Sequence, residues 1–207
     1  MNPDDFADRV GAEKSTELDR LGSQQLLVAL TGADLEPEVV LTASANSEHS
    51  AAETFAEWAD GSDDARETFE RLADQEREHY ERVVAELDEF EPLDSIDSMQ
   101  AYLRGLDDDI SRAGGLVGRS LVGNRTLLQV VNFFVNEADK RRANLFRDLR
   151  ADTRENVEDG RAVLAECCAD DDDWNRAFDV ATETVQIAYD DYADALTGMG
   201  LDPKPIC

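Results

Sequence analysis

Apolar residues recur at three- and four-residue spacing along almost the whole chain, and the sequence lacks the strict alternation of half-buried β-strands. This period is typical of α-helices that bury one face. Prolines, which interrupt helices, occur at only 5 of the 207 positions. The pattern therefore predicts an all-α protein.

Breaks in the pattern predict where the helices of the first half begin and end. Short helices are expected within residues 4–31. Pro37 stands where the first turn of a helix tolerates proline, and the helix that it opens should end near residue 60. The Gly-Ser-Asp sequence at 61–63 indicates a tight turn, after which a second helix is expected to end near residue 90.

The second half is predicted to begin with a long connection over residues 91–123. This connection contains a short helical segment at 98–106 and several glycines, which indicate a turn or close helix packing. A long helical stretch, with room for a kink at 151–160, should fill 124–168, and a last helix 172–197, with acidic residues at its start as the cap. Two helical hairpins joined by a long crossover are typical of a ferritin-like four-helix bundle.

The chain is expected to divide into three parts around this bundle. Residues 1–34 form an N-terminal helical extension, residues 35–200 form the ferritin-like helical bundle, and residues 201–207 form a C-terminal tail. Three cysteines with no Cys-x-x-Cys pair exclude a disulfide framework and a four-cysteine zinc or iron site.

Three polar residues interrupt the apolar faces of the first hairpin at one height. Glu48 lies 14 residues before Ser62 and Glu76 lies 14 residues after it. An antiparallel hairpin that turns at Ser62 therefore brings both carboxylates to the same level. His79 is one turn beyond Glu76 on the same face. His49 should point about 100° away from Glu48, toward solvent or a neighbouring element.

Carboxylates that face a helical core are costly unless a cation or a hydrogen-bond partner compensates them. Glu48, Glu76 and His79 are therefore candidate metal ligands, and this mixture of oxygen and nitrogen donors suits iron or manganese. The alternative is a buried polar cluster without metal. The pattern alone leaves both interpretations open.

The first hairpin resembles the rubrerythrin family of ferritin-like proteins over about residues 36–90. Its first helix carries Glu48 followed by Ala51, Phe55, Trp58 and Ala59, and its second helix contains the segment Phe-Glu-Arg-Leu-Ala-Asp-Gln-Glu-Arg-Glu-His at 69–79. The resemblance implies a four-helix bundle that holds two irons through one Glu and one Glu-x-x-His from each hairpin. It also implies an activity on peroxide, dioxygen or iron.

The second hairpin departs from this family pattern. With only two histidines in the chain, His49 and His79, a second Glu-x-x-His is excluded. The matching height, measured from a turn near residue 171, falls at Glu155, Glu158 and Glu183, which form no ligand motif. The family's rubredoxin-like module is also missing, because it needs paired Cys-x-x-Cys motifs. The residues thus indicate a half site rather than a complete two-iron centre.

The composition bears on partners and surroundings. Asp and Glu number 48 against 20 Lys and Arg, a net charge of -28. Such a charge repels nucleic acid and anionic membrane surfaces. Because the Debye length falls to about 3 Å at 1 M salt, the acidic surface indicates adaptation to concentrated salt, and it resembles proteins of halophilic archaea. Without signal-peptide features at the start, a cytoplasmic location is expected.

Two functions follow as hypotheses. The first is a rubrerythrin-like protein with a partial carboxylate and histidine metal site that handles iron or peroxide. The second is a non-catalytic scaffold or partner-binding bundle in which the same residues form a degenerate site. A homo-oligomer is a further hypothesis, because two half sites at a symmetry axis would together offer four carboxylates and two histidines.

Overall fold

The computed structural model describes residues 3–93 and 96–203, and all regular elements within these ranges are helices, as predicted. None of the helices in these ranges has the length and apolar character needed to cross a membrane. In chain order the elements are η1 (Pro3–Asp5), α1 (Phe6–Glu13), α2 (Ser15–Leu21), α3 (Gln25–Thr31), α4 (Pro37–Asp60), α5 (Arg66–Val84), α6 (Ser98–Arg104), α7 (Asp109–Asn136), α8 (Lys140–Cys167) and α9 (Asp171–Gly198).

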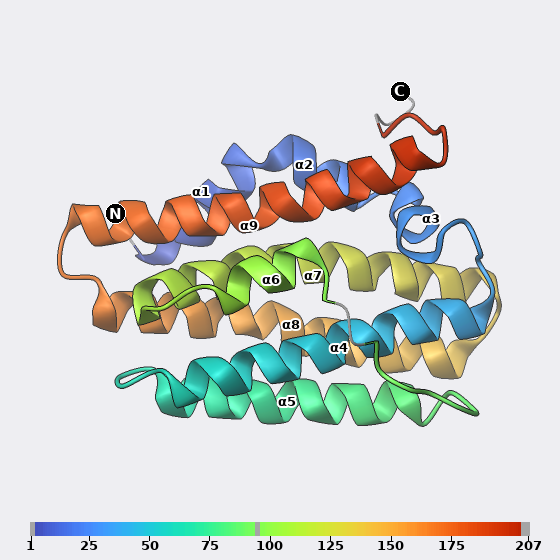
Figure 1. Ribbon diagram of the computed structural model, residues 1–207, viewed down its shortest axis with the longest axis horizontal. Coiled ribbons are helices and arrows are strands. Elements are labelled where there is room, and N and C mark those ends of the chain that lie inside the picture. Colours follow the sequence, from blue (N-terminus) through green and yellow to red (C-terminus); the bar gives the residue numbers. More distant parts are fainter. Residues whose placement is uncertain (1–2, 94–95, 204–207) are drawn as a thin grey trace.

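Five long helices run roughly along one axis (Figure 1). The helices α4 and α5 form one hairpin and α7 and α8 form another, and the two hairpins contact each other through α4 with α7 and α5 with α8. The last helix, α9, packs along α7. The short helices α1, α2 and α3 contact α9 and α7, so the segment before residue 35 contributes to the core. Residues 204–207, part of the expected tail, lie outside the described residues, and Cys207 with them.

The second hairpin differs from the one predicted. It consists of α7 and α8, whereas the sequence pattern indicated one helical stretch at 124–168, with any kink at 151–160, paired with a helix at 172–197. The chain turns at 137–139, where Ala138 adopts a left-handed conformation with φ 58° and the Asp139 side chain caps α8 by accepting from the backbone N–H of Arg142. Neither glycine nor proline marks this turn, which is why the pattern did not reveal it.

The glycine-rich segment is part of a helix rather than of a connection. Gly114 and Gly118 lie within α7 on the side that faces α9. A Cβ atom at Gly118 would be 2.6 Å from the carbonyl oxygen of Ala181, and one at Gly114 would overlap the carbonyl oxygen of Ala177. The two backbones therefore approach more closely than any side chain at these positions allows. Close helix packing, one of the two explanations considered, is the reason for these glycines.

The helix α5 ends at Val84, six residues before the predicted end. The chain leaves the helix where Glu86 is held from α8: the Arg142 side chain donates to the Glu86 carboxylate at 3.2 Å and to its backbone carbonyl at 3.2 Å. Beyond this point Phe90 packs edge-on against Tyr80, with 5.9 Å between the ring centroids. These tertiary contacts outweigh the helical pattern of residues 85–90.

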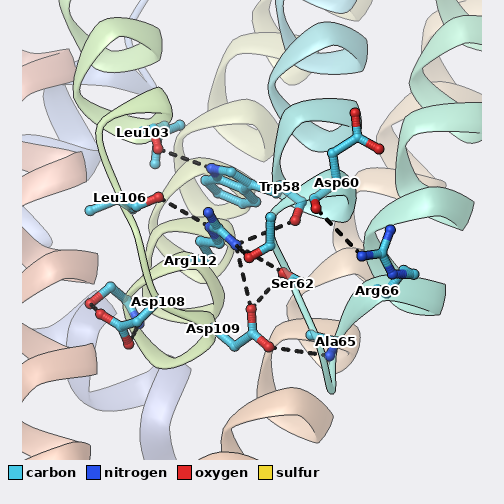
Figure 2. A network of polar contacts seen from close by, with 12 residues as sticks. Trp58, Asp60, Ser62, Ala65, Arg66, Leu103, Leu106, Asp108, Asp109 and Arg112 are labelled. Atoms are coloured by element: carbon cyan, nitrogen blue, oxygen red, sulfur yellow. Dashed lines mark hydrogen bonds and ion pairs between the residues drawn. The ribbon is translucent and has the colours of Figure 1, made fainter.

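A buried arginine fixes the turn of the first hairpin against the start of α7 (Figure 2). The Arg112 guanidinium donates to the carbonyl of Gly61 at 2.7 Å and to that of Leu106 at 3.1 Å. Asp109 accepts from the Ser62 hydroxyl at 2.5 Å and from the backbone N–H of Ala65 at 3.3 Å. Because the contacts join both sides of the turn to α7, they set the height of α4 and α5 relative to the second hairpin.

The apolar core consists of two clusters, one toward each end of the paired hairpins. The first contains Phe55, Trp58 and Phe69 together with residues of α1, α2, α7 and α9, and the second contains Leu41 and Phe146 with other residues of α4, α5, α7 and α8. Buried polar side chains occupy the level between the two clusters. This polar level contains the candidate site.

Candidate metal centre

The structure brings the three predicted residues together. Each of the three, Glu48 from α4 and Glu76 and His79 from α5, offers a ligand atom within 4.8 Å of the others. Together they form a group of side chains that could hold a metal ion. Their exposed fractions are 5, 0 and 2%. The Nδ1 atom of His79 lies 3.7 Å from Glu76 Oε2 and 4.0 Å from Glu48 Oε2. The matching height inferred from the sequence is confirmed.

Local helix geometry explains this convergence. Glu76 and His79 are three residues apart in α5 and therefore share one face. Glu48 faces them from α4, where the neighbouring inward positions are Ala45 and Ala52, both buried. These small side chains let the longer Glu48 carboxylate reach the space between the helices.

His79 is oriented by a carboxylate of the second hairpin. Its Nε2 atom lies 3.0 Å from Asp152 Oδ2 on α8. Because an ionised carboxylate only accepts hydrogen bonds, Nε2 must carry a proton in this contact. The buried Nδ1 atom has no hydrogen-bond partner, and it faces two carboxylates. A proton on Nδ1, a proton on one of the carboxylates or a metal ion would each offset the repulsion between these groups.

An arginine of the second hairpin reaches the same site. Arg119 on α7 is 6% exposed, and its Nη1 atom donates to Glu76 Oε1 at 3.2 Å. The guanidinium also lies over the Phe55 ring, 5.2 Å from the centroid. The other carboxylate oxygen of Glu76, Oε2, and the Nε atom of Arg119 are buried without hydrogen-bond partners. The site thus holds a compensating positive charge and still has unused donor and acceptor atoms.

The two carboxyl groups differ in their proton affinity. Burial raises the pKa of Glu48 well above its usual range, and the negative charge of Glu76 raises it further. Burial also favours the neutral form of Glu76, but the charge of the Arg119 guanidinium, aided by attraction to nearby His79, outweighs it and lowers the pKa of Glu76. Without metal, Glu76 is therefore the ionised member of the pair and Glu48 the one that retains a proton more readily.

The pKa of His79 predicts how stability depends on pH in the metal-free protein. Burial lowers this pKa, but attraction to Glu76 and the hydrogen bond and attraction to Asp152 raise it above the usual value, about 6.5. Protonated His79 therefore stabilises the fold fully below about pH 6.5, and this stabilisation is lost as the pH rises through the raised pKa. The difference in unfolding free energy between the native protein and a His79→Asn variant should shrink over that range in chemical denaturation. The same comparison with His49→Asn controls for the other histidine, and a difference for His79 that is independent of pH would contradict the prediction.

The other residues weighed in the sequence lie outside the cluster. The side chain of His49 is 30% exposed, lies 3.9 Å from Glu53 and packs against the Tyr80 ring. The acids that the predicted second hairpin placed at the height of the site are all exposed: Glu155, Glu158 and Glu183. Their assignment to that height followed from a wrong hairpin, because α9 packs outside the pair of hairpins.

Arg119 and Asp152 were not found by sequence reasoning. Arg119 falls in the glycine-rich segment that was interpreted as a connection, so no helical face was assigned to it. Asp152 belongs to α8, whose start at residue 140 the pattern missed. Arg119 stands between the apolar pairs Leu116-Val117 and Leu121-Val122, and this position was the one signal that could have indicated a buried charge partner.

A cavity of about 490 Å³ adjoins the site. Glu48, Arg119 and Thr153 line its inner end, and apolar side chains of α3, α4, α7 and α9 form most of its wall. Such a volume lies within the range of small-molecule sites, roughly 300–1,000 Å³. The candidate metal centre is therefore connected to a space that a ligand can fill.

Comparison with protein-family models, with curated proteins and with solved structures finds no match for this chain. The geometry of the site therefore carries the argument about function by itself.

Proposed function

We propose that the protein is a rubrerythrin-like member of the ferritin-like four-helix bundles that binds one iron or manganese ion through Glu48, Glu76 and His79, and that it handles iron or peroxide at this ion. The bundle would consist of α4, α5, α7 and α8, with α9 and the N-terminal helices packed outside. The observation that carries the proposal is the buried, unpartnered Nδ1 atom of His79, which faces two carboxylates.

The distances at this atom suit a metal ion better than a proton. A proton on Nδ1 would need a carboxylate oxygen within about 3.2 Å for a good hydrogen bond, and the two oxygens lie at 3.7 and 4.0 Å. Ligand bonds of about 2.0–2.2 Å allow two donor atoms of one ion to lie up to about 4 Å apart. The contact between His79 Nε2 and Asp152 matches the way in which metal-binding histidines are usually oriented by a second carboxylate.

The residues fit one ion and not two. In a two-iron centre of the family, α7 and α8 would contribute further carboxylates and a second histidine. Within the described residues they present Arg119, Asp152, Thr153 and Asn156 at this level, and Asp152 contacts Nε2 of His79. Arg119 places a fixed positive charge against Glu76. This charge repels a second cation. The protein would therefore hold one ion in the half site that the sequence led us to expect.

Bound iron or manganese would supply a redox-active centre, and the chain's own residues would prepare it. Asp152 fixes the ring of His79 through Nε2, so that Nδ1 is the atom available for ligation. Arg119 orients Glu76 and offers hydrogen bonds to an anionic or peroxide group that enters from the cavity. The apolar clusters on either side exclude water from the site, which strengthens each of these interactions.

The Arg119–Glu76 ion pair is the observation that favours the second candidate, a non-catalytic bundle. It gives Glu76 a partner without metal, and protonation of Glu48 and His79 would neutralise the rest of the cluster. In that case the polar level would serve only to align the helices, as buried polar groups do in some helical assemblies.

Metal titration separates the two candidates. Native purification without chelators should yield bound iron or manganese, and the metal-free protein should bind one Mn²⁺ per chain. Because loss of a group that merely orients a ligand costs about 10–100-fold in metal affinity, Glu48→Gln should weaken binding by more than about 100-fold. Asp152→Asn should fall within the 10–100-fold range.

The matched control is Glu78→Gln, an exposed position on the same helix as Glu76, which should leave the affinity unchanged. If the native protein contains neither metal and binds none on titration, the metal proposal is wrong and the non-catalytic bundle becomes the favoured candidate. Peroxide consumption by the iron-loaded protein, with a chemical reductant supplied, should fall in Glu76→Gln and persist in Glu78→Gln.

A further inference from the structure

The cavity beside the site has an apolar wall and an apolar rim. Its wall includes Leu26, Val40, Val122 and Val130, all buried. Leu30, Leu93 and Ile96, at its outer part, are 49, 63 and 39% exposed. Large apolar side chains exposed together around a cavity are typical of a site that receives an apolar ligand.

Arg119 supplies a positive charge at the inner end of this cavity. It is buried, and the contacts described above use only its Nη1 atom for Glu76 and its π face for Phe55. A guanidinium has five N–H donors, and the buried Nε–H is without a partner. Arg119 is also the only Lys or Arg among the described residues that line the cavity. Its spare donors match the bidentate geometry of a carboxylate.

Two of the acids at the cavity bind backbone groups of α6, and one of them, Asp97, is also attracted by the charge of Arg119. Asp97 accepts from the backbone N–H of Gln100 at 2.7 Å, and Asp191 accepts from that of Ser98 at 3.2 Å. Both carboxylates thus accept hydrogen bonds from backbone N–H groups in the first turn of α6. Glu48 is the third acid, and it shares the inner end of the cavity with Arg119.

We propose that this cavity binds an amphipathic carboxylate, a molecule with a hydrocarbon body and one carboxylate head, whose head pairs with Arg119 and whose body lies along the apolar wall. The proposal goes beyond metal binding, because it depends on Arg119 and the cavity wall. A metal ion at Glu48 would neutralise the acid nearest the head and strengthen binding of the carboxylate.

Calorimetric titration with octanoate, 1-octanol and octylammonium tests the head group, in both the metal-free and the Mn²⁺-loaded protein. Octanoate should bind at least about tenfold more tightly than octanol in one or both forms, because a charged hydrogen bond adds that much. In a series from hexanoate to dodecanoate the affinity should rise about fourfold for each methylene until the cavity is full. If the metal proposal is wrong, the protein will not bind Mn²⁺. The carboxylate proposal is tested separately, by the affinity for octanoate.

Two variants locate the ligand. Arg119→Lys keeps the charge but loses the bidentate fork, so it should weaken octanoate binding and leave octanol binding unchanged. Ala43→Leu narrows the cavity from α4 and should weaken both ligands, whereas Ala151→Leu, at an exposed position on α8, should affect neither. Equal affinity for octanoate and octanol, tighter binding of octylammonium, or no binding in either form overturns the proposal.

Discussion

Replacing Arg119 with methionine should lower the unfolding free energy of the metal-free protein by about 3–5 kcal/mol, because the change leaves Glu76 buried and charged without its partner. For a chain of this size the midpoint of thermal unfolding should fall by about 6–20 °C. Circular dichroism during thermal and urea unfolding measures both quantities. Added Mn²⁺ should restore part of the loss, since a bound cation would compensate Glu76 in place of the guanidinium.

The control for the arginine is Arg125→Met, which makes the same change of net charge on the same helix, at a half-buried position outside the polar cluster. It should change the stability much less. The double variant Arg119→Met with Glu76→Gln removes both charges. Its loss of unfolding free energy should be smaller than the sum of the losses in the two single variants by at least about 2 kcal/mol. Additive effects would show that the ion pair does not hold this level of the core together.

The second large effect concerns the contact between α7 and α9. Replacing Gly114 with alanine should destabilise the protein by about 2–3 kcal/mol, as overpacking of a filled interface does. A Cβ atom there would overlap the carbonyl oxygen of Ala177 and lie 3.0 Å from its Cα atom. Backbone atoms cannot rotate aside, so α9 would have to move away from α7. Urea denaturation of the variant gives the loss.

Gly11→Ala is the matched substitution. Gly11 lies in α1, and nothing lies within 4 Å of an added Cβ atom. Alanine should stabilise this helix by up to about 1 kcal/mol, because it restricts the unfolded chain more than glycine does. The same chemical change should therefore have opposite signs at the two positions. A stabilised Gly114→Ala protein would show that α7 and α9 are not in close contact.

The first hairpin was predictable from its sequence because local signals agree with its tertiary packing. Pro37 marks the start of α4, the turn at 61–63 contains glycine, and the apolar period continues through both helices. Counting residues from the turn then placed Glu48 and Glu76 at one height. In an antiparallel pair with a short turn, sequence distance from the turn converts directly into position along the axis.

The second half was not predictable by the same reasoning. Glycine in a helix usually signals a break, but in α7 it is required by the approach of α9, a contact that only the folded chain reveals. Ala138, in the turn between α7 and α8, adopts a left-handed conformation that is uncommon for alanine, so the sequence does not predict a turn there. With the start of α7 and the turn between α7 and α8 misplaced, the positions of Arg119 and Asp152 could not be counted from a turn.

The division of the core into two clusters also determines what a fluorescence experiment reports. Both tryptophans of the chain, Trp58 and Trp174, belong to the first cluster, and the second contains neither. Tryptophan emission therefore monitors the end of the molecule where α1 packs against α9, and it gives no direct signal from the end where Phe134 stacks on Phe146. Tryptophan emission alone would therefore give the signal of the folded protein even after the opposite end had unfolded.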